Sequence, residues 1–179
     1  LKRRCVRAAS LSALKRPVTT FLTRTMNNLD VDLLLEQCRA ELTHVQDSIT
    51  TLGLTSPVAP YLTKYAVIRA CGVVEVSFKA LIADFCSKTS TKQVKRYIAL
   101  KITRSSANPS HNKIVEMLDQ FDENWKTKYK SNIGTDPDKT HLLDSLQSLV
   151  DARNDFAHGG NPTLSINDVI KHFDHARRV

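Results

Sequence analysis

Apolar residues recur every three or four positions along the chain from residue 26 onward, and this spacing predicts helices. The first amphipathic helix is predicted over residues 29–52, capped from the region of Asn27, Asn28 and Asp30 and ended by Gly53. The second, over about residues 59–87, is apolar on almost every side, which is typical of the central helix of a bundle. Gly72 in its middle is unfavourable in a helix and predicts a close approach of another backbone.

The rest of the chain continues the helical pattern, and no segment alternates as a strand does. Helices are predicted over residues 90–104, 110–126 and 142–160, and from Ser165 onward. Residues 126–140 are polar and rich in lysine, with Asp-Pro and Gly punctuation, and predict a loop. The predicted fold class is therefore all-α, an up-and-down bundle of about five to six helices joined largely by short loops.

The net charge of +8 is unevenly distributed along the chain. Residues 1–25 contain seven basic residues and no acid, whereas the segment 26–179 has nineteen basic residues against eighteen acids. The predicted organisation is thus a basic leader, 1–25, and one helical domain, 26–179. The leader is disordered or upstream of the natural start, a basic arm that touches nucleic acid, or a targeting segment. A nearly neutral body makes the overall charge a weak argument for RNA or DNA binding.

Cysteine usage and hydropathy predict a cytoplasmic protein that does not enter a membrane. The four cysteines form no C-x-x-C pair, and no run of about eighteen apolar residues exists. No glycine-rich phosphate loop or zincin motif is present, so we expect no cofactor and no metal. His172, Asp174 and His175 have a spacing that could suit a metal, but such a group near a helix end is more often a solvated polar face.

The segment 142–160 contains the most unusual residue of the chain. Its apolar stripe includes Leu146 and Leu149, and Arg153 falls near the middle of that stripe rather than on the solvated face. A guanidinium among leucines is costly unless an anion or a functional cleft compensates for it. His158 follows five residues later, just before the helix stop at Gly159-Gly160.

Two interpretations of this pair stay open. A histidine that carries a proton beside a guanidinium that binds phosphate would suit cleavage of an RNA phosphodiester. Alternatively, Arg153 forms a buried ion pair and His158 merely caps the helix. Glu75, a charge on the apolar central helix, is the candidate partner of Arg153, either structurally or to orient it.

Three lysines, Lys126, Lys128 and Lys130, are weaker candidates, because they could hold an RNA backbone or simply be solvated.

The segment Arg153-Asn154-Asp155-Phe156-Ala157-His158 resembles the signature of the HEPN superfamily, and the helix that bears Glu75 resembles the second helix of its RiboL-PSP-like branch. The resemblance covers about residues 29–178 and implies a HEPN-like bundle. It also implies a homodimer with a composite, metal-independent endoribonuclease site. Arg153 and His158 would be catalytic, and Asn154 and Glu75 would support them. Gly160 stands where toxins with nucleotidyltransferase antitoxins often have tyrosine, so that subgroup is not indicated.

The first functional hypothesis is therefore a homodimer that cleaves single-stranded or tRNA-like RNA in a toxin or phage-defence setting, with an antitoxin or a neighbouring defence protein as a further partner. The second is a non-catalytic HEPN module that binds RNA or protein. A nucleotide-binding sensor domain is a third.

Overall fold

The computed structural model describes residues 28–87, 90–161 and 163–179, and within these ranges the regular elements are all helices, without a strand. The leader predicted over residues 1–25 lies outside the described residues. The helices are α1 (Leu29–Leu52), α2 (Ala59–Ser87), α3 (Lys92–Ile98), the π-helical segment η1 (Ala99–Thr103), α4 (His111–Phe121), α5 (Glu123–Thr135), α6 (Lys139–Ala157) and α7 (Ile166–Ala176). The predicted all-α class is confirmed.

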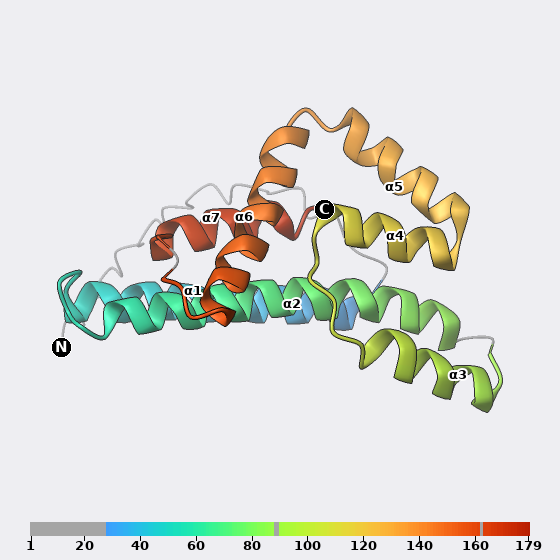
Figure 1. Ribbon diagram of the computed structural model, residues 1–179, viewed down its shortest axis with the longest axis horizontal. Coiled ribbons are helices and arrows are strands. Elements are labelled where there is room, and N and C mark those ends of the chain that lie inside the picture. Colours follow the sequence, from blue (N-terminus) through green and yellow to red (C-terminus); the bar gives the residue numbers. More distant parts are fainter. Residues whose placement is uncertain (1–27, 88–89, 162) are drawn as a thin grey trace, which may run out of the picture.

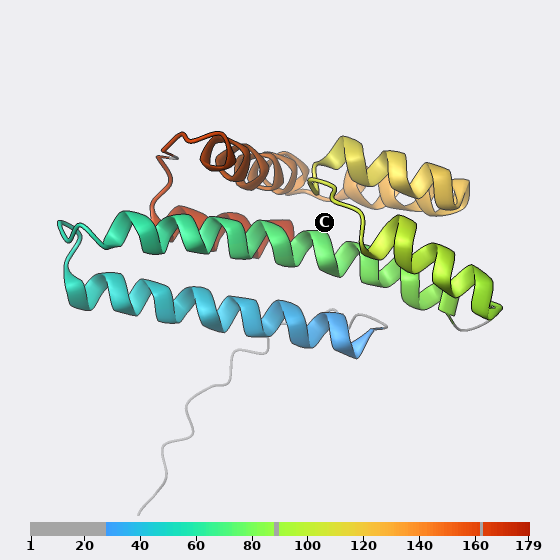
Figure 2. The same cartoon turned by 60° about the horizontal axis from the view of Figure 1, so that its bottom comes forward.

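Helices α1 and α2 form the base of the molecule as a long antiparallel pair (Figures 1 and 2). Both α6 and α7 pack against α2, and α7 also packs against α1. The core lies between these four helices, where Leu42, Val67, Leu146 and Phe173 are fully buried. The apolar periodicity on which the prediction rests is therefore the pattern of core contacts.

Helix ends follow local side-chain chemistry. The Asn28 side chain accepts hydrogen bonds from the first turn of α1, and Gly53 ends that helix with a φ of 87°. Ser165 and Asp168 form a reciprocal capping box at the start of α7. These boundaries agree with the sequence prediction.

The prediction of a loop over residues 126–140 is wrong for most of this segment, because α5 occupies Glu123–Thr135. Asp122 caps this helix. Trp125, Tyr129 and Ile133, four residues apart, form a single apolar row that packs inward. So narrow a row among lysines and asparagines does not stand out as an amphipathic pattern. The α4–α5 hairpin joins the end of α2 through Phe85, whose ring centroid lies 5.0 Å from that of Trp125.

The predicted basic helix over residues 90–104 is present as α3 and η1, which together form an arm that projects from the bundle (Figure 1). Neither element has a buried residue.

Gly72 does not meet another backbone in this chain. A Cβ built there has no neighbour within 4 Å among the described atoms, so the predicted close contact inside the protein is wrong.

Candidate functional site

Arg153 is half-buried near the end of α6 and is held by two amide side chains. Its Nη1 donates to Oδ1 of Asn108, at 2.9 Å, and to Oδ1 of Asn154, at 3.3 Å. Asn108 Nδ2 also donates to Asn154 Oδ1, at 2.9 Å. The three side chains therefore form a closed triangle, in which each residue restricts the other two.

Glu75 does not pair with Arg153, so the direct contact considered from the sequence is wrong. Its carboxylate binds the ammonium of Lys79, one turn further along α2, and accepts the backbone N–H of Ala107 at 2.9 Å. Lys79 in turn donates to the carbonyl of Ser105. Glu75 and Lys79 thus fix the segment that precedes Asn108, and Glu75 acts on Arg153 only through that segment.

Cys71 on α2 lies near both Arg153 and Glu75. Burial raises the pKa of its thiol to about 11, while the nearby Arg153 lowers it and Glu75 raises it. A thiol with so high a pKa stays protonated at neutral pH and is a poor nucleophile. We therefore assign Cys71 to packing rather than to chemistry.

The guanidinium of Arg153 remains largely available for a ligand. Within the described ranges it forms no ion pair, and its hydrogen bonds use Nη1 alone. Asn108 and Asn154 are neutral, so the arginine keeps its full charge, and a guanidinium has five N–H donors. This arrangement differs from the Arg–carboxylate pair that would have made Arg153 purely structural.

His158 is more exposed to solvent than Arg153. It is the C-cap residue of α6, and its ring is exposed. The next residue, Gly159, has a φ of 86°, and the Gly160 N–H donates to the Asp155 carbonyl at 2.8 Å. These are the features of a Schellman motif, so the predicted helix stop is confirmed. The backbone is fixed, whereas the imidazole has no hydrogen bond to another described residue.

Arg153 and His158 do not share a helix face. Five residues of α-helix separate them by about 140° around the axis. Asn154, which shares a face with His158 in sequence terms, bonds to Arg153 and Asn108 instead. A single chain therefore presents a fixed cation and an exposed imidazole without a bond between them.

The three candidate lysines lie on α5, and one of them, Lys126, lies beside acids. Lys126 forms ion pairs with Asp119, at 2.7 Å, and with Glu123, at 3.8 Å. Lys128 and Lys130 are exposed. Asp119 and Glu123 offset the charge of Lys126, which leaves two exposed cations on α5, and we do not retain this helix as the principal anion-binding surface.

The polar residues His172, Asp174 and His175 on α7 contact neighbouring helices. Both His172 and His175 contact the hydroxyl of the buried Ser145, at 3.1 Å and 2.8 Å, and Asp174 pairs with Arg39 on α1 at 2.9 Å. These side chains join α7 to its neighbours, so the expectation of a merely solvated face was wrong. Among the described residues, no group of three His, Cys, Asp or Glu could hold a metal ion.

Asn108 is the site residue that sequence reasoning missed. It lies in the segment between η1 and α4, directly before the buried Pro109, where no periodicity applies. Asn-Pro predicts only a turn. Its partner on α6 is 45 residues away in sequence, so only the tertiary fold reveals its role.

A cavity of about 330 Å³ lies elsewhere, between the α4–α5 hairpin and the long helices. Leu35, Phe78 and Trp125 line it, whereas Arg153 and His158 do not. It does not form part of the arginine network.

An all-α bundle with an Arg-Asn-x-x-x-His segment at the end of its penultimate helix defines the class of this protein. The model that describes the RiboL-PSP-HEPN family matches residues 34–179. The chain belongs to that family, which supports an RNA-related function. No curated protein and no solved structure matches the chain. In the described ranges, no helix combines the length and apolarity needed to cross a membrane.

Proposed function

We propose that this protein is a metal-independent endoribonuclease whose chemistry rests on Arg153 and His158. The supporting observation is the state of Arg153, which is fixed by the neutral amides of Asn108 and Asn154 and retains its charge and most of its donors. A preorganised charge of this kind stabilises negative charge as it develops on a phosphoryl group. A structural arginine would instead be neutralised by a carboxylate.

The proposed reaction needs only the RNA and these side chains. The imidazole of His158 accepts the proton of a ribose 2′-hydroxyl, and the 2′-oxygen forms a bond to phosphorus. The bond from phosphorus to the 5′-oxygen breaks, and that oxygen takes up a proton from an imidazolium. The products are a 2′,3′-cyclic phosphate and a 5′-hydroxyl. Arg153 pairs with the phosphoryl oxygens throughout.

A homodimer is part of this proposal, because one chain does not bring the two groups together. Helix α2 presents an exposed apolar stripe that consists of Tyr61, Tyr65, Ile68 and Val76, with Gly72 at its centre. These positions fall within about 80° around the helix axis. The open space at Gly72 would admit the backbone of a second copy.

The stripe borders the proposed site. Lys64, beside it on α2, lies with its Nζ 5.3 Å from the ring centroid of Phe156, two residues before His158. Cys71, also on α2, is close enough to Arg153 for the guanidinium to affect its pKa. If a second copy packs on the stripe, the C-terminal end of its α6 would therefore lie near the C-terminal end of α6 in the first copy.

The activity is tested with purified protein and unpaired RNA in the presence of EDTA. We expect cleavage, and we expect Arg153→Ala and His158→Ala each to lower the rate by at least about 100-fold. His44→Ala, which changes an exposed histidine on α1, is the matched control and should cleave as the parent does. Equal rates in all variants would refute the proposal.

The dimer is tested by the double variant Ile68→Asp/Val76→Asp. We expect a monomer by light scattering, an unchanged helical circular-dichroism spectrum and a loss of cleavage. Leu54→Asp, at an exposed apolar residue outside the stripe, should leave a dimer. Full cleavage by a demonstrated monomer would rule out the composite site.

A toxin or defence role, with an antitoxin or neighbouring protein as partner, extends the same proposal. Expression in a bacterium should arrest growth in a manner that depends on Arg153 and His158. If the protein binds RNA and neither cleaves it nor arrests growth, the alternative of a non-catalytic RNA-binding module takes its place.

A further inference from the structure

The basic charge of the body is concentrated in one stretch of the chain. Residues 85–115 contain seven of the nineteen basic residues found after residue 25 and no acid. The remainder of the body has twelve basic residues against eighteen acids. The nearly neutral total of residues 26–179 therefore conceals one strongly positive region, while the rest of this body is net negative.

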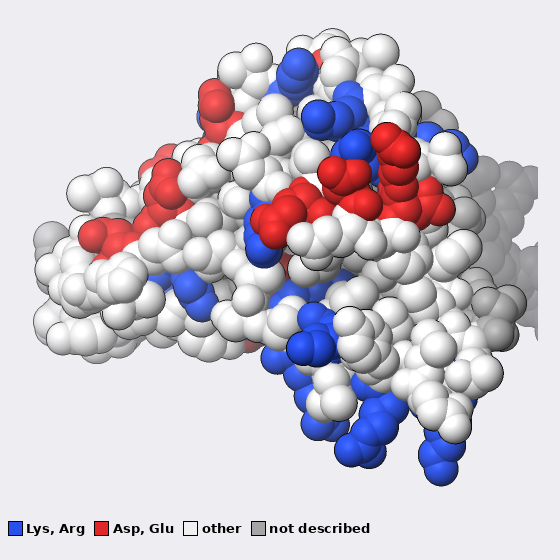
Figure 3. All heavy atoms as spheres, turned by 45° about the vertical axis from the view of Figure 1, so that its right-hand side comes forward, with Lys and Arg blue, Asp and Glu red and all other residues white. Residues whose placement is uncertain are grey.

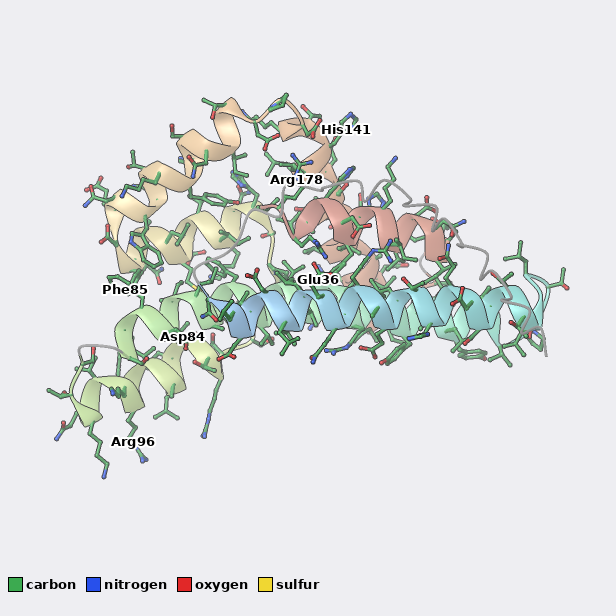
Figure 4. All side chains as sticks on the ribbon, turned by 180° about the vertical axis from the view of Figure 1, so that it is seen from behind. Glu36, Asp84, Phe85, Arg96, His141 and Arg178 are labelled. Atoms are coloured by element: carbon green, nitrogen blue, oxygen red, sulfur yellow. The ribbon has the colours of Figure 1, made fainter. Side chains whose placement is uncertain are left out.

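The structure places four of these cations on the α3–η1 arm and a fifth at the C-cap position directly after it: Lys92, Lys95, Arg96 and Lys101, and then Arg104. All five are exposed, and none forms an ion pair with another described residue. Figure 3 shows the lysines and arginines at the foot of the molecule, separate from the acidic patch above them. In Figure 4, Arg96 lies on the arm outside the bundle.

The arm also exposes large apolar side chains between its cations. Tyr97 is 61% exposed, Leu100 48% and Val94 44%. Apolar side chains that stay in water contribute little to the stability of the fold, so packing within the chain does not account for these three residues. Cations interleaved with an aromatic ring are what an unpaired nucleic-acid strand binds, because phosphates pair with the cations and bases stack on the ring.

The root of the arm is fixed to the proposed site. Lys79 bonds to Ser105, Glu75 bonds to Ala107, and Asn108 bonds to Arg153. Arg104 is four residues from Asn108, which is at most about 14 Å of extended chain. The arm itself is about 18 Å long, from its twelve residues at about 1.5 Å each. A strand bound along the arm would therefore lead to Arg153.

We infer that the α3–η1 arm is the surface that holds the substrate, and that the substrate is an unpaired RNA strand. This inference rests on the proposed ribonuclease function and deepens it. It assigns to the arm the role that the sequence suggested for Lys126, Lys128 and Lys130. Duplex RNA fits less well, because its bases are stacked in the helix and cannot reach Tyr97.

Binding is measured separately from cleavage, with His158→Ala as the background and fluorescence anisotropy of a labelled unpaired RNA as the readout. We expect Lys95→Glu/Arg96→Glu to raise Kd at least about tenfold and to reduce the salt dependence of binding, since two phosphate contacts are lost. The matched control, Lys128→Glu/Lys130→Glu on α5, carries the same change of charge and should alter Kd by less than about threefold.

A second set of measurements tests whether the substrate is an unpaired RNA strand. Tyr97→Ala should weaken binding of the unpaired strand about fivefold or more, because a stacking partner is removed. It should leave the weaker binding of a duplex of the same sequence unchanged. All these residues are exposed, so the variants should keep the parent's melting temperature.

Three results would overturn the inference. The first is an equal effect of the α5 and arm double variants, and the second is equal affinity for unpaired and duplex RNA. The third is arm-dependent binding to vesicles that contain phosphatidylserine together with arm-independent binding to RNA, which would make the arm a membrane surface. If the protein binds RNA through the arm but does not cleave it, only the proposed chemistry is refuted.

Discussion

Arg153 and the cations of the α3–η1 arm carry the same charge in opposite settings. Arg153 is half-buried and fixed by Asn108 and Asn154, whereas Lys95 and Arg96 project into solvent without a partner among the described residues. A fixed charge can stabilise a transition state, because it needs no reorganisation when charge develops. Flexible surface charges attract and hold a polyanion, and their effect is screened by salt. The comparison therefore separates a place for chemistry from a place for binding.

The largest expected effect comes from changing Arg153 while its charge is kept. Arg153→Lys retains the cation but lacks the planar guanidinium that reaches Asn108 and a phosphate together. We expect kcat to fall by about 100-fold or more, with RNA affinity changed by less than about threefold. Arg96→Lys on the arm is the matched control and should change neither quantity. Equal kcat in the two variants would remove the distinction between fixed and flexible charge.

The next effect comes from giving Arg153 the carboxylate that it lacks. Asn108→Asp has nearly the same shape and would form an ion pair with the guanidinium. We expect kcat to fall by about 10- to 100-fold, with a melting temperature equal to or above that of the parent.

Asn108→Ala supplies the contrast. It should also lower kcat, but it removes a hydrogen-bond partner from Arg153 and Asn154 and should lower stability by about 1 kcal/mol. If Asn108→Asp cleaves RNA at the parental rate, the charge of Arg153 has no part in the reaction.

A smaller effect is expected from the arm in steady-state cleavage. Lys95→Glu/Arg96→Glu should raise KM about tenfold at about 0.1 M salt and leave kcat within about twofold. The KM difference from the parent should shrink as salt is raised, because screening weakens exposed charges. A fall in kcat at saturating RNA would show that the arm acts on the chemistry and not on binding alone.

The smallest effect concerns histidines that pack rather than react. Burial lowers the pKa of His172, and burial together with Lys130 and Lys139 lowers that of His111. Since the folded-state pKa is depressed, the unfolded chain binds the proton first as pH falls below about 6.5, and stability declines there. Urea unfolding between pH 8 and pH 5 should show this decline, and His111→Gln/His172→Gln should reduce it. An identical decline in the double variant would assign it to other groups.

The sequence predicts features that depend on near neighbours along the chain. Periodicity gives the long helices, Ser165 and Asp168 give a capping box, and Gly159 gives the end of α6. The position of Arg153 within an apolar stripe is enough to mark it as an unusual residue. Each of these signals comes from within a single helix or its ends.

Features that depend on tertiary contacts are not predictable in this way. Asn108 has no pattern that distinguishes it from other loop asparagines, and Glu75 meets the segment before Asn108 rather than Arg153 itself. Net charge misleads for a related reason, since the total over the body hides the separation between the arm and the remaining surface. The place of a charge, and not the sum, decides what it can bind.

The most direct test of the central claim is the chemistry of the product ends. An unpaired RNA is incubated with the protein in EDTA, and the fragments are analysed by mass spectrometry. We expect 2′,3′-cyclic phosphate and 5′-hydroxyl ends. We also expect no cleavage by His158→Ala, and none where a single 2′-deoxynucleotide precedes the scissile phosphate. Cleavage that requires a divalent metal, or that persists in His158→Ala, would contradict the proposed reaction.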